Sequence, residues 1–162
     1  MPPESSLNKK QMKQILLSLE LLKIEIANTI GTQVLYSRSG GGAGSILLLK
    51  LSNGNRIMAW RYWEIYKNNN LLCTAEDDTT AVYGIISQTA PLLENKYIYS
   101  FNLDPLYNIS IMLSDNFCLK IYSVKDVYDD LPNWNYSIPD KNIVYEITSN
   151  LEIECKPWKT GD

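Results

Sequence analysis

The feature that most constrains the fold is a strand–turn–strand unit that occurs twice in the sequence. Residues 49–60 align with residues 111–122 at an offset of 62, and residues 30–37 align with residues 93–100 at an offset of 63. Similarity at a fixed spacing indicates a duplicated supersecondary unit, and one small copy alone buries too little apolar surface to be stable. The alternative is coincidence, because strand–turn–strand patterns resemble one another.

A helix is expected ahead of each copy. Apolar residues spaced three and four apart predict an amphipathic helix from Lys9 to Thr29, with Asn8 or Ser6 as its N-cap. Gly31 is well placed to end it. A second helix is expected over residues 79–92, preceded by acidic residues that complement its dipole.

The remaining apolar runs, bounded by turn residues, predict strands. Asn53-Gly54 is the strongest hairpin signal, since both residues tolerate a positive φ. The expected strands cover residues 32–37, 45–51, 56–66, 71–74, 97–101, 109–113, 117–122, 134–138, 143–147 and 151–155.

These elements predict an α+β fold in which two helix-plus-antiparallel-meander repeats share one core, with the helices on one face of the sheet. The 162 residues fit a single domain, 1–162, with a loose tail at 1–7. The first repeat is expected to span residues 9–75 and the second residues 79–155.

Several enzyme classes are excluded by what the sequence lacks. There is no histidine, so Ser-His-Asp and Cys-His catalysis are ruled out. The glycines at 40–44 are not followed by the lysine of a phosphate-binding loop, and they predict a flexible hairpin loop. A pair of carboxylates acting in hydrolysis remains an alternative, but no pair is singled out. We therefore expect a non-enzymatic protein without cofactor or metal ion.

Charge and cysteine content bear on partners and compartment. The formal net charge is −3, which gives no basic footprint for nucleic acid. Cys73, Cys118 and Cys155 have neither metal-type spacing nor an even count, so reduced cysteines in or near strands are expected. No apolar run is long enough for a membrane span, and the opening residues do not resemble a signal peptide. These features predict a cytoplasmic protein.

The run from Trp60 to Trp63 contains residue types enriched at binding hot spots. On one continuous strand, Trp60 and Tyr62 face one side while Arg61 and Trp63 face the other. Arg61, Tyr62 and Trp63 are therefore candidate binding residues. The alternative is that Trp60 fills the core and Trp63 packs under a loop.

Two acidic groups follow corresponding ends of the two copies and could form one patch for a basic protein surface or a hard cation. A calcium-loop motif is absent, which favours a protein partner, and a simple solvated surface is the alternative. The groups consist of Glu76, Asp77 and Asp78, and of Asp126, Asp129 and Asp130.

A resemblance follows from the run at residues 44–54, the Trp60-Arg61 pair and the spacing from Trp134 to Pro139. This pattern resembles small uncharacterised bacterial proteins with a duplicated strand–turn–strand unit. Those proteins are similar to immunity proteins of toxin–immunity systems. The resemblance implies an immunity or antitoxin type of protein that binds and occludes a partner protein such as a toxin. It assigns no residue a role.

Two other functions remain open from the sequence. The chain could be a structural or assembly subunit, forming a homodimer through exposed edge strands. It could also bind a small molecule in a pocket between sheet and helices.

Overall fold

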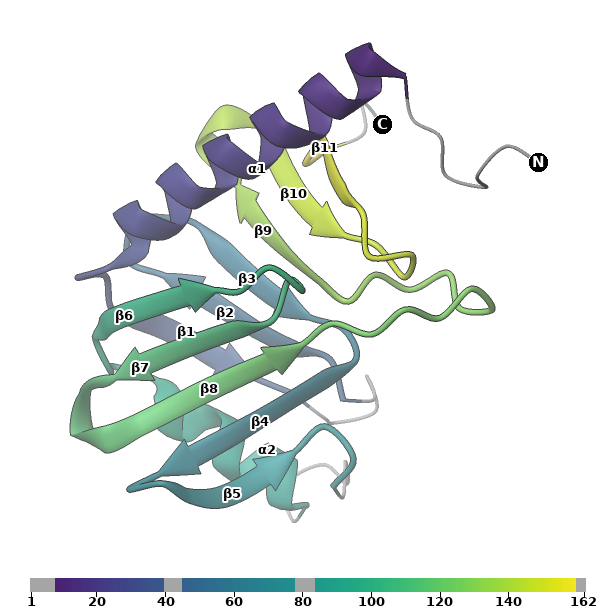
Figure 1. Cartoon of the computed structure of the whole chain (residues 1–162). Coiled ribbons are helices and arrows are strands. Elements are labelled where there is room, and N and C mark those ends of the chain that lie inside the picture. Colours follow the sequence, from purple (N-terminus) through teal and green to yellow (C-terminus); the bar gives the residue numbers. More distant parts are fainter. Residues whose placement is uncertain (1–7, 40–44, 78–83, 160–162) are drawn as a thin grey trace.

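The computed structural model describes residues 8–39, 45–77 and 84–159. The predictions for the tail at 1–7, the glycine loop at 40–44 and the start of the second helix lie outside these residues. The fold is α+β and contains two antiparallel sheets (Figure 1). Among the described residues, no helix is long and apolar enough to cross a membrane.

The predicted first helix is confirmed as α1, Lys9–Thr29. The Asn8 side chain accepts a hydrogen bond from the Gln11 backbone N–H at 2.8 Å, and the Gln11 side chain accepts one from Asn8 N–H at 3.0 Å. This capping box satisfies two N–H groups that the helix start leaves unpaired. Gly31 follows the helix with a φ of +92°, as a glycine after a helix end often does.

The second helix is shorter than predicted in the part that the structure describes. Helix α2 is Ile85–Thr89, and a 3-10 helix, η1 at Ala90–Leu93, continues it with Pro91 in its first turn. Gly84 is the N-cap of α2 and has no side chain to contribute a cap.

Six strands form one sheet and five form the other. The six-stranded sheet has the order β1-β2-β3-β9-β10-β11 and the five-stranded sheet β5-β4-β8-β7-β6. The strands are β1 Val34–Arg38, β2 Leu47–Leu51, β3 Arg56–Ala59, β4 Tyr62–Lys67, β5 Asn70–Thr74, β6 Ile98–Leu103, β7 Ile109–Leu113, β8 Phe117–Tyr122, β9 Trp134–Ile138, β10 Ile143–Ile147 and β11 Ile153–Pro157. The hairpin predicted at Asn53-Gly54 joins β2 to β3, but only Gly54 takes a positive φ, of +88°.

The chain crosses between the sheets at two places, and this corrects the predicted strand over residues 56–66. β3 ends at Ala59 in one sheet, and β4 begins at Tyr62 in the other. The second crossing joins β8 to β9 in the opposite direction. Each sheet is therefore completed by strands from the other half of the chain.

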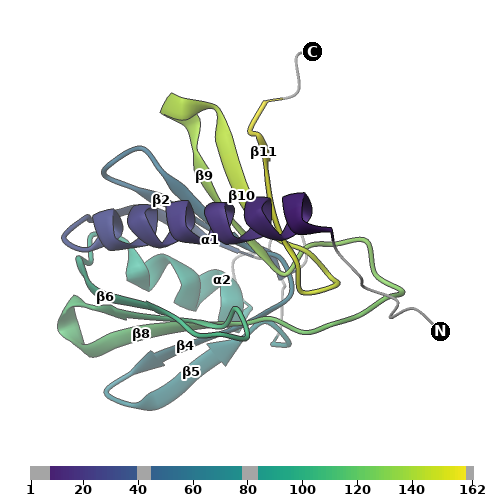
Figure 2. The ribbon, with the colours of Figure 1, turned by 45° about the horizontal axis from the view of Figure 1, so that its top comes forward.

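The helices contact edge strands of both sheets. α1 contacts β6 and β11, α2 contacts β5, and η1 contacts β1. Figure 2 shows α1 lying across the two sheets. This arrangement does not confirm the expectation that both helices cover one face of a single sheet, because the crossings divide the strands between two sheets.

Hydrogen bonds at the start of β1 and β6 are reciprocal. Val34 N–H donates to the Lys96 carbonyl at 2.9 Å, and Ile98 N–H donates to the Thr32 carbonyl at 2.8 Å. The donor Val34 lies two residues after the acceptor Thr32, and the donor Ile98 lies two residues after the acceptor Lys96. This geometry matches Val34 with Ile98, whereas the sequence alignment pairs Val34 with Tyr97, one residue short.

The core lies between the sheets and contains side chains from both. Trp63, Trp134 and Tyr136 are its largest fully buried members. The indole of Trp63 donates to the Ser45 carbonyl at 2.6 Å, and that of Trp134 donates to the Tyr107 carbonyl at 2.8 Å. Both large aromatics therefore bury apolar area without leaving their N–H groups unpaired.

Candidate functional site

The connection from β8 to β9, residues 123–133, is the candidate site and is named the β8–β9 loop. It takes eleven residues to cross between the sheets, while the β3–β4 connection makes the opposite crossing in two residues, Trp60 and Arg61. Figure 1 shows the loop projecting away from the sheets. A long loop that the topology does not require is commonly a functional one.

The base of the loop is closed by Asn133, which is fully buried. Its side-chain oxygen accepts the Val124 N–H at 3.0 Å, and its amide donates to the carbonyls of Val124 at 3.1 Å and Thr148 at 2.9 Å. Its backbone N–H donates to Ile147 at 2.8 Å. A buried amide satisfied in this way fixes where the loop leaves the fold.

The middle of the loop is held by Arg61, whose side chain is only 9% exposed. Its Nη2 lies 3.1 Å from the Asp126 carboxylate and 3.5 Å from that of Asp129. Its Nη1 is buried and has no hydrogen-bond partner among the described residues. The guanidinium also lies 5.6 Å from the centre of the Tyr62 ring, a cation–π distance.

The same two carboxylates shape the backbone of the loop. Asp126 accepts the Tyr128 N–H at 3.0 Å, and Asp129 accepts the Leu131 N–H at 2.8 Å. Each is an Asx turn, in which a side chain takes the place of a backbone acceptor. The loop is thus a preformed structure, so binding through it requires little further ordering.

Exposed apolar side chains stand between these anchors. Tyr128 is 96% exposed, Val127 63% and Leu131 45%. Asp130 beside them is also exposed and makes no ion pair among the described residues. An aromatic and two aliphatic side chains held out from the surface among carboxylates form a potential contact surface for another protein.

The first acidic group lies near the same end of the five-stranded sheet. β4 runs antiparallel to both β5 and β8, so β5 and β8 end where β4 begins. Asp77 accepts the Thr74 N–H at 2.7 Å, and Glu76 is exposed, while Asp78 lies outside the described residues. β5 and β8 flank β4, which separates them by about 10 Å. Among the described residues, Arg61 forms ion pairs with Asp126 and Asp129 and with no carboxylate of the first group.

The outer face of the five-stranded sheet beside the loop carries a tyrosine cluster. One oxygen of Glu64 accepts the hydroxyls of Tyr66 at 2.8 Å and Tyr122 at 2.7 Å. Burial and the Glu64 carboxylate raise the pKa of Tyr122, and the hydrogen bond to Glu64 raises the pKa of Tyr66. Both phenols therefore stay protonated, as donors to Glu64, at alkaline pH values where an ordinary tyrosine ionises.

Of the predicted site residues, Trp63 does not belong to the candidate site. It is 1% exposed and belongs to the core, so its side chain is not available to a partner. The alternation of faces expected over Trp60–Trp63 fails because the chain changes sheet there. Sequence reasoning missed Val127, Tyr128, Leu131 and Asn133. The signal that could have found them is the segment at residues 123–133, which follows the second copy of the repeat and has no equivalent in the strand predicted after the first copy.

A hollow with a volume of about 350 Å³ lies on the outer face of the six-stranded sheet, apart from the β8–β9 loop. Trp60 and Trp158 line it together with Met58 and Arg56. The Arg56 guanidinium lies 5.3 Å from the centre of the Trp158 ring, and the buried Trp60 N–H has no partner among the described residues. Such a surface suits a flat apolar group.

In the part of the chain that the structure describes, no three His, Cys, Asp or Glu side chains are grouped to hold a metal ion. Comparison with protein families, curated proteins and solved structures finds no match. The function is therefore inferred from the residues of this chain alone.

Proposed function

We propose that this chain is a non-enzymatic binding protein of the immunity or antitoxin type, acting in the cytoplasm, which occludes a partner protein with the β8–β9 loop. The observation that carries the proposal is Tyr128, 96% exposed on a loop whose base and middle are fixed by Asn133 and Arg61. Occlusion needs a few anchors and shape complementarity, and it needs no chemistry of its own.

The expected partner surface is basic. The loop carries Asp126, Asp129 and Asp130, and Glu76 and Asp77 lie beyond the same end of the sheet. Arg61 and the exposed Lys125 of the loop compensate part of this charge, and Asp130 and Glu76 are exposed carboxylates without an ion pair among the described residues. Complementary charge would speed association, and the rate should fall with added salt.

The test uses the purified protein and the product of the gene beside its own, since toxin and immunity genes are expected to be adjacent. A complex that abolishes the toxicity or activity of that product supports the proposal. Undiminished activity of that product, together with no complex in size-exclusion chromatography, would contradict the proposal. The double variant Val127→Gly/Tyr128→Gly lacks the two exposed side chains of the loop. If this variant still forms the complex, the role of the loop is refuted, while the proposed function itself is not.

We also propose that the chain is an internal duplication, a reading that the reciprocal hydrogen bonds and the two crossings support. β1-β2-β3 of the first half pair with β9-β10, and β6-β7-β8 of the second half pair with β4-β5. Exchanging the halves therefore reproduces the strand order of both sheets except for β11, which has no counterpart in the five-stranded sheet. On this reading the β8–β9 loop is an addition to one copy, which favours a function for it.

A second candidate function is binding of a small planar ligand in the Trp60–Trp158 hollow, favoured by the unpartnered Trp60 N–H. Quenching of tryptophan fluorescence by a ligand, lost in Trp158→Ala and kept in Tyr128→Ala, would support this function. Quenching that Trp158→Ala leaves unchanged would contradict it.

A further inference from the structure

The outer edge of β11 is unpaired in the six-stranded sheet. β11 is the last strand of that sheet and pairs only with β10 among the described residues. Glu154, Cys155, Lys156 and Pro157 are all exposed. Such an edge offers the backbone N–H and C=O groups of Ile153 and Cys155 to another strand, whereas Pro157 offers only its C=O group because it has no N–H.

The backbone groups of Cys155 point outward. Trp158 N–H donates to Asn142 at 3.1 Å, and Thr148 N–H donates to Glu152 at 2.9 Å, so even-numbered residues here turn their backbone groups toward β10. Because these directions alternate along a strand, those of Ile153 and Cys155 face away from β10. An incoming antiparallel strand would therefore exchange hydrogen bonds with Cys155.

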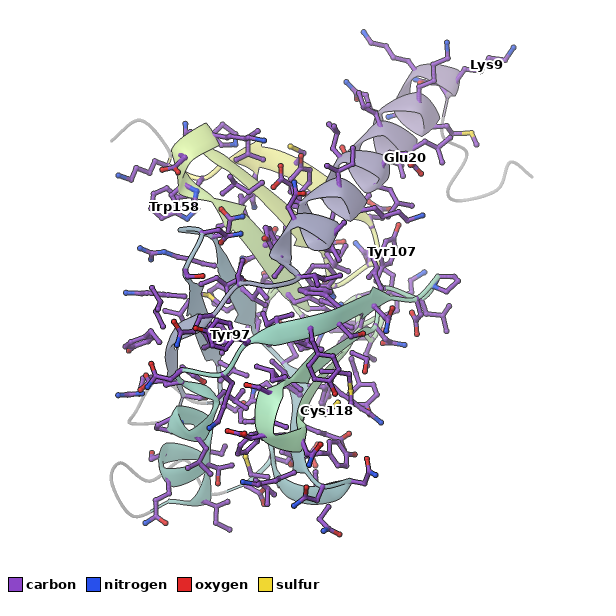
Figure 3. The ribbon with its side chains drawn as sticks, turned by 90° about the vertical axis from the view of Figure 1, so that its left-hand side faces the viewer. Lys9, Glu20, Tyr97, Tyr107, Cys118 and Trp158 are labelled. Carbon is purple, nitrogen blue, oxygen red and sulfur yellow. The ribbon has the colours of Figure 1, made fainter. Side chains whose placement is uncertain are left out.

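A groove of about 620 Å³ lies beside this edge, under α1. Leu17 and Leu21 of α1 line it and are 60% and 42% exposed, and Cys155 lines the opposite side. Figure 3 shows the part of α1 that bears Lys9 extending beyond the strands. The helix therefore leaves apolar side chains beside an unpaired strand.

The charges on β11 are complementary to a second β11. Two antiparallel copies centred on Cys155 place Glu154 of each opposite Lys156 of the other. Within its own sheet, Glu154 lies opposite Glu146, a like charge, and Lys156 pairs with Glu146 at 2.9 Å. A second copy would thus bring to Glu154 the opposite charge that its own neighbour does not supply.

We propose that the protein forms a homodimer in which two β11 strands pair antiparallel across a two-fold axis at Cys155, with α1 of each copy covering the junction. The contact is isologous, as a closed dimer requires. It joins the two six-stranded sheets into one continuous sheet and covers Leu17 and Leu21. It goes beyond the proposed partner-binding function and involves no residue of the β8–β9 loop.

Cross-linking tests the register. Cys155 is the exposed cysteine, while Cys73 and Cys118 are buried. Directly opposed residues that exchange hydrogen bonds have Cα atoms about 5.5 Å apart, within reach of a short bismaleimide. We expect a covalent dimer from the native protein, none from Cys155→Ser, and twice the 18.5 kDa chain mass by light scattering. A monomer at 100 μM, or a dimer that Cys155 does not cross-link, would overturn the proposal.

Charge reversal tests the pairing of side chains. Glu154→Lys and Lys156→Glu each place like charges opposite one another, so each variant alone should show a dissociation constant at least tenfold higher. An equal mixture of the two variants restores opposite charges at both pairs and should form the heterodimer. Because the mixture contains the same two proteins, its recovery shows that neither variant failed to fold. Unchanged dimers of the single variants would contradict the interface.

Discussion

One buried guanidinium joins the two places where the chain changes sheet. Arg61 lies in the short crossing, and the carboxylates that it contacts lie in the long one. Arginine suits this position because a single guanidinium nitrogen, Nη2, carries two N–H groups and lies within ion-pair distance of both carboxylates. The sequence predicts Arg61, Asp126 and Asp129 as candidate site residues, but their contact with one another follows only from the fold.

Replacing this residue tests its role as an anchor. Arg61→Gln should lower the free energy of unfolding by about 1–3 kcal/mol, because it removes the charge opposite two partly buried carboxylates. It should also speed chymotryptic cleavage after Tyr128. Arg38→Gln is the matched control, since the Arg38 side chain is 47% exposed and that of Arg61 is 9% exposed, and an ion pair of an exposed side chain contributes little. Equal cleavage rates in both variants would show that Arg61 does not hold the loop.

The pKa of Cys73 gives a prediction for alkaline pH. Burial raises it from an ordinary value of 9.0 to about 11. Between these values the unfolded thiol ionises while the folded one stays protonated, so the free energy of unfolding falls as pH rises. The loss is about 2 kcal/mol at pH 11 and at most about 3 kcal/mol. Urea denaturation at pH 8 and pH 11 should show that the free energy of unfolding falls less for Cys73→Ala than for the native protein. An identical loss would assign the effect to other groups, such as the tyrosines.

At the scale of elements, periodicity predicts the first helix and most strand positions well. The interior of the strand predicted at 56–66 fails, because the chain leaves one sheet at Ala59 and enters the other at Tyr62. An alternating pattern indicates which side chains face a core, but it does not indicate which sheet a strand joins. The break resets the alternation, and this is why Trp63 is the tryptophan of the run that lies in the core.

Helix α1 has buried side chains only in its C-terminal half. Two leucine substitutions, one in each half of the helix, test this difference. Leu22→Ala removes a fully buried side chain and should cost about 3 kcal/mol of unfolding free energy. Leu16→Ala changes a side chain that is 59% exposed and should cost less than about 0.5 kcal/mol. Urea denaturation measures both, and comparable losses would place α1 differently on the sheets.

At the scale of the whole molecule, the halves exchange strands. β4 and β5 complete the sheet of the second half, and β9 and β10 complete that of the first. The repeated pattern in the sequence indicates similar units, and it leaves open whether they share one sheet or exchange strands between two. That choice depends on the two-residue crossing, Trp60-Arg61, which contains none of the residues that usually mark the end of a strand, such as Gly, Pro, Asn or Asp.

Splitting the chain tests this exchange. Fragments 1–77 and 84–162 should each be largely unfolded alone, since each lacks the strands that complete its sheet. Mixed together, they should recover the circular dichroism spectrum of the intact chain. A single fragment that folds with a cooperative transition of its own would contradict the exchanged arrangement.

The binding role of the β8–β9 loop is tested most directly by the affinity of one variant for the partner protein. Tyr128→Ala should weaken binding at least tenfold, about 1.4 kcal/mol, because a central exposed tyrosine is the kind of residue that anchors an interface. Tyr99→Ala, which changes a tyrosine 56% exposed on β6, is the control and should bind as the native protein does. Equal dissociation constants for the native protein and Tyr128→Ala would contradict the account.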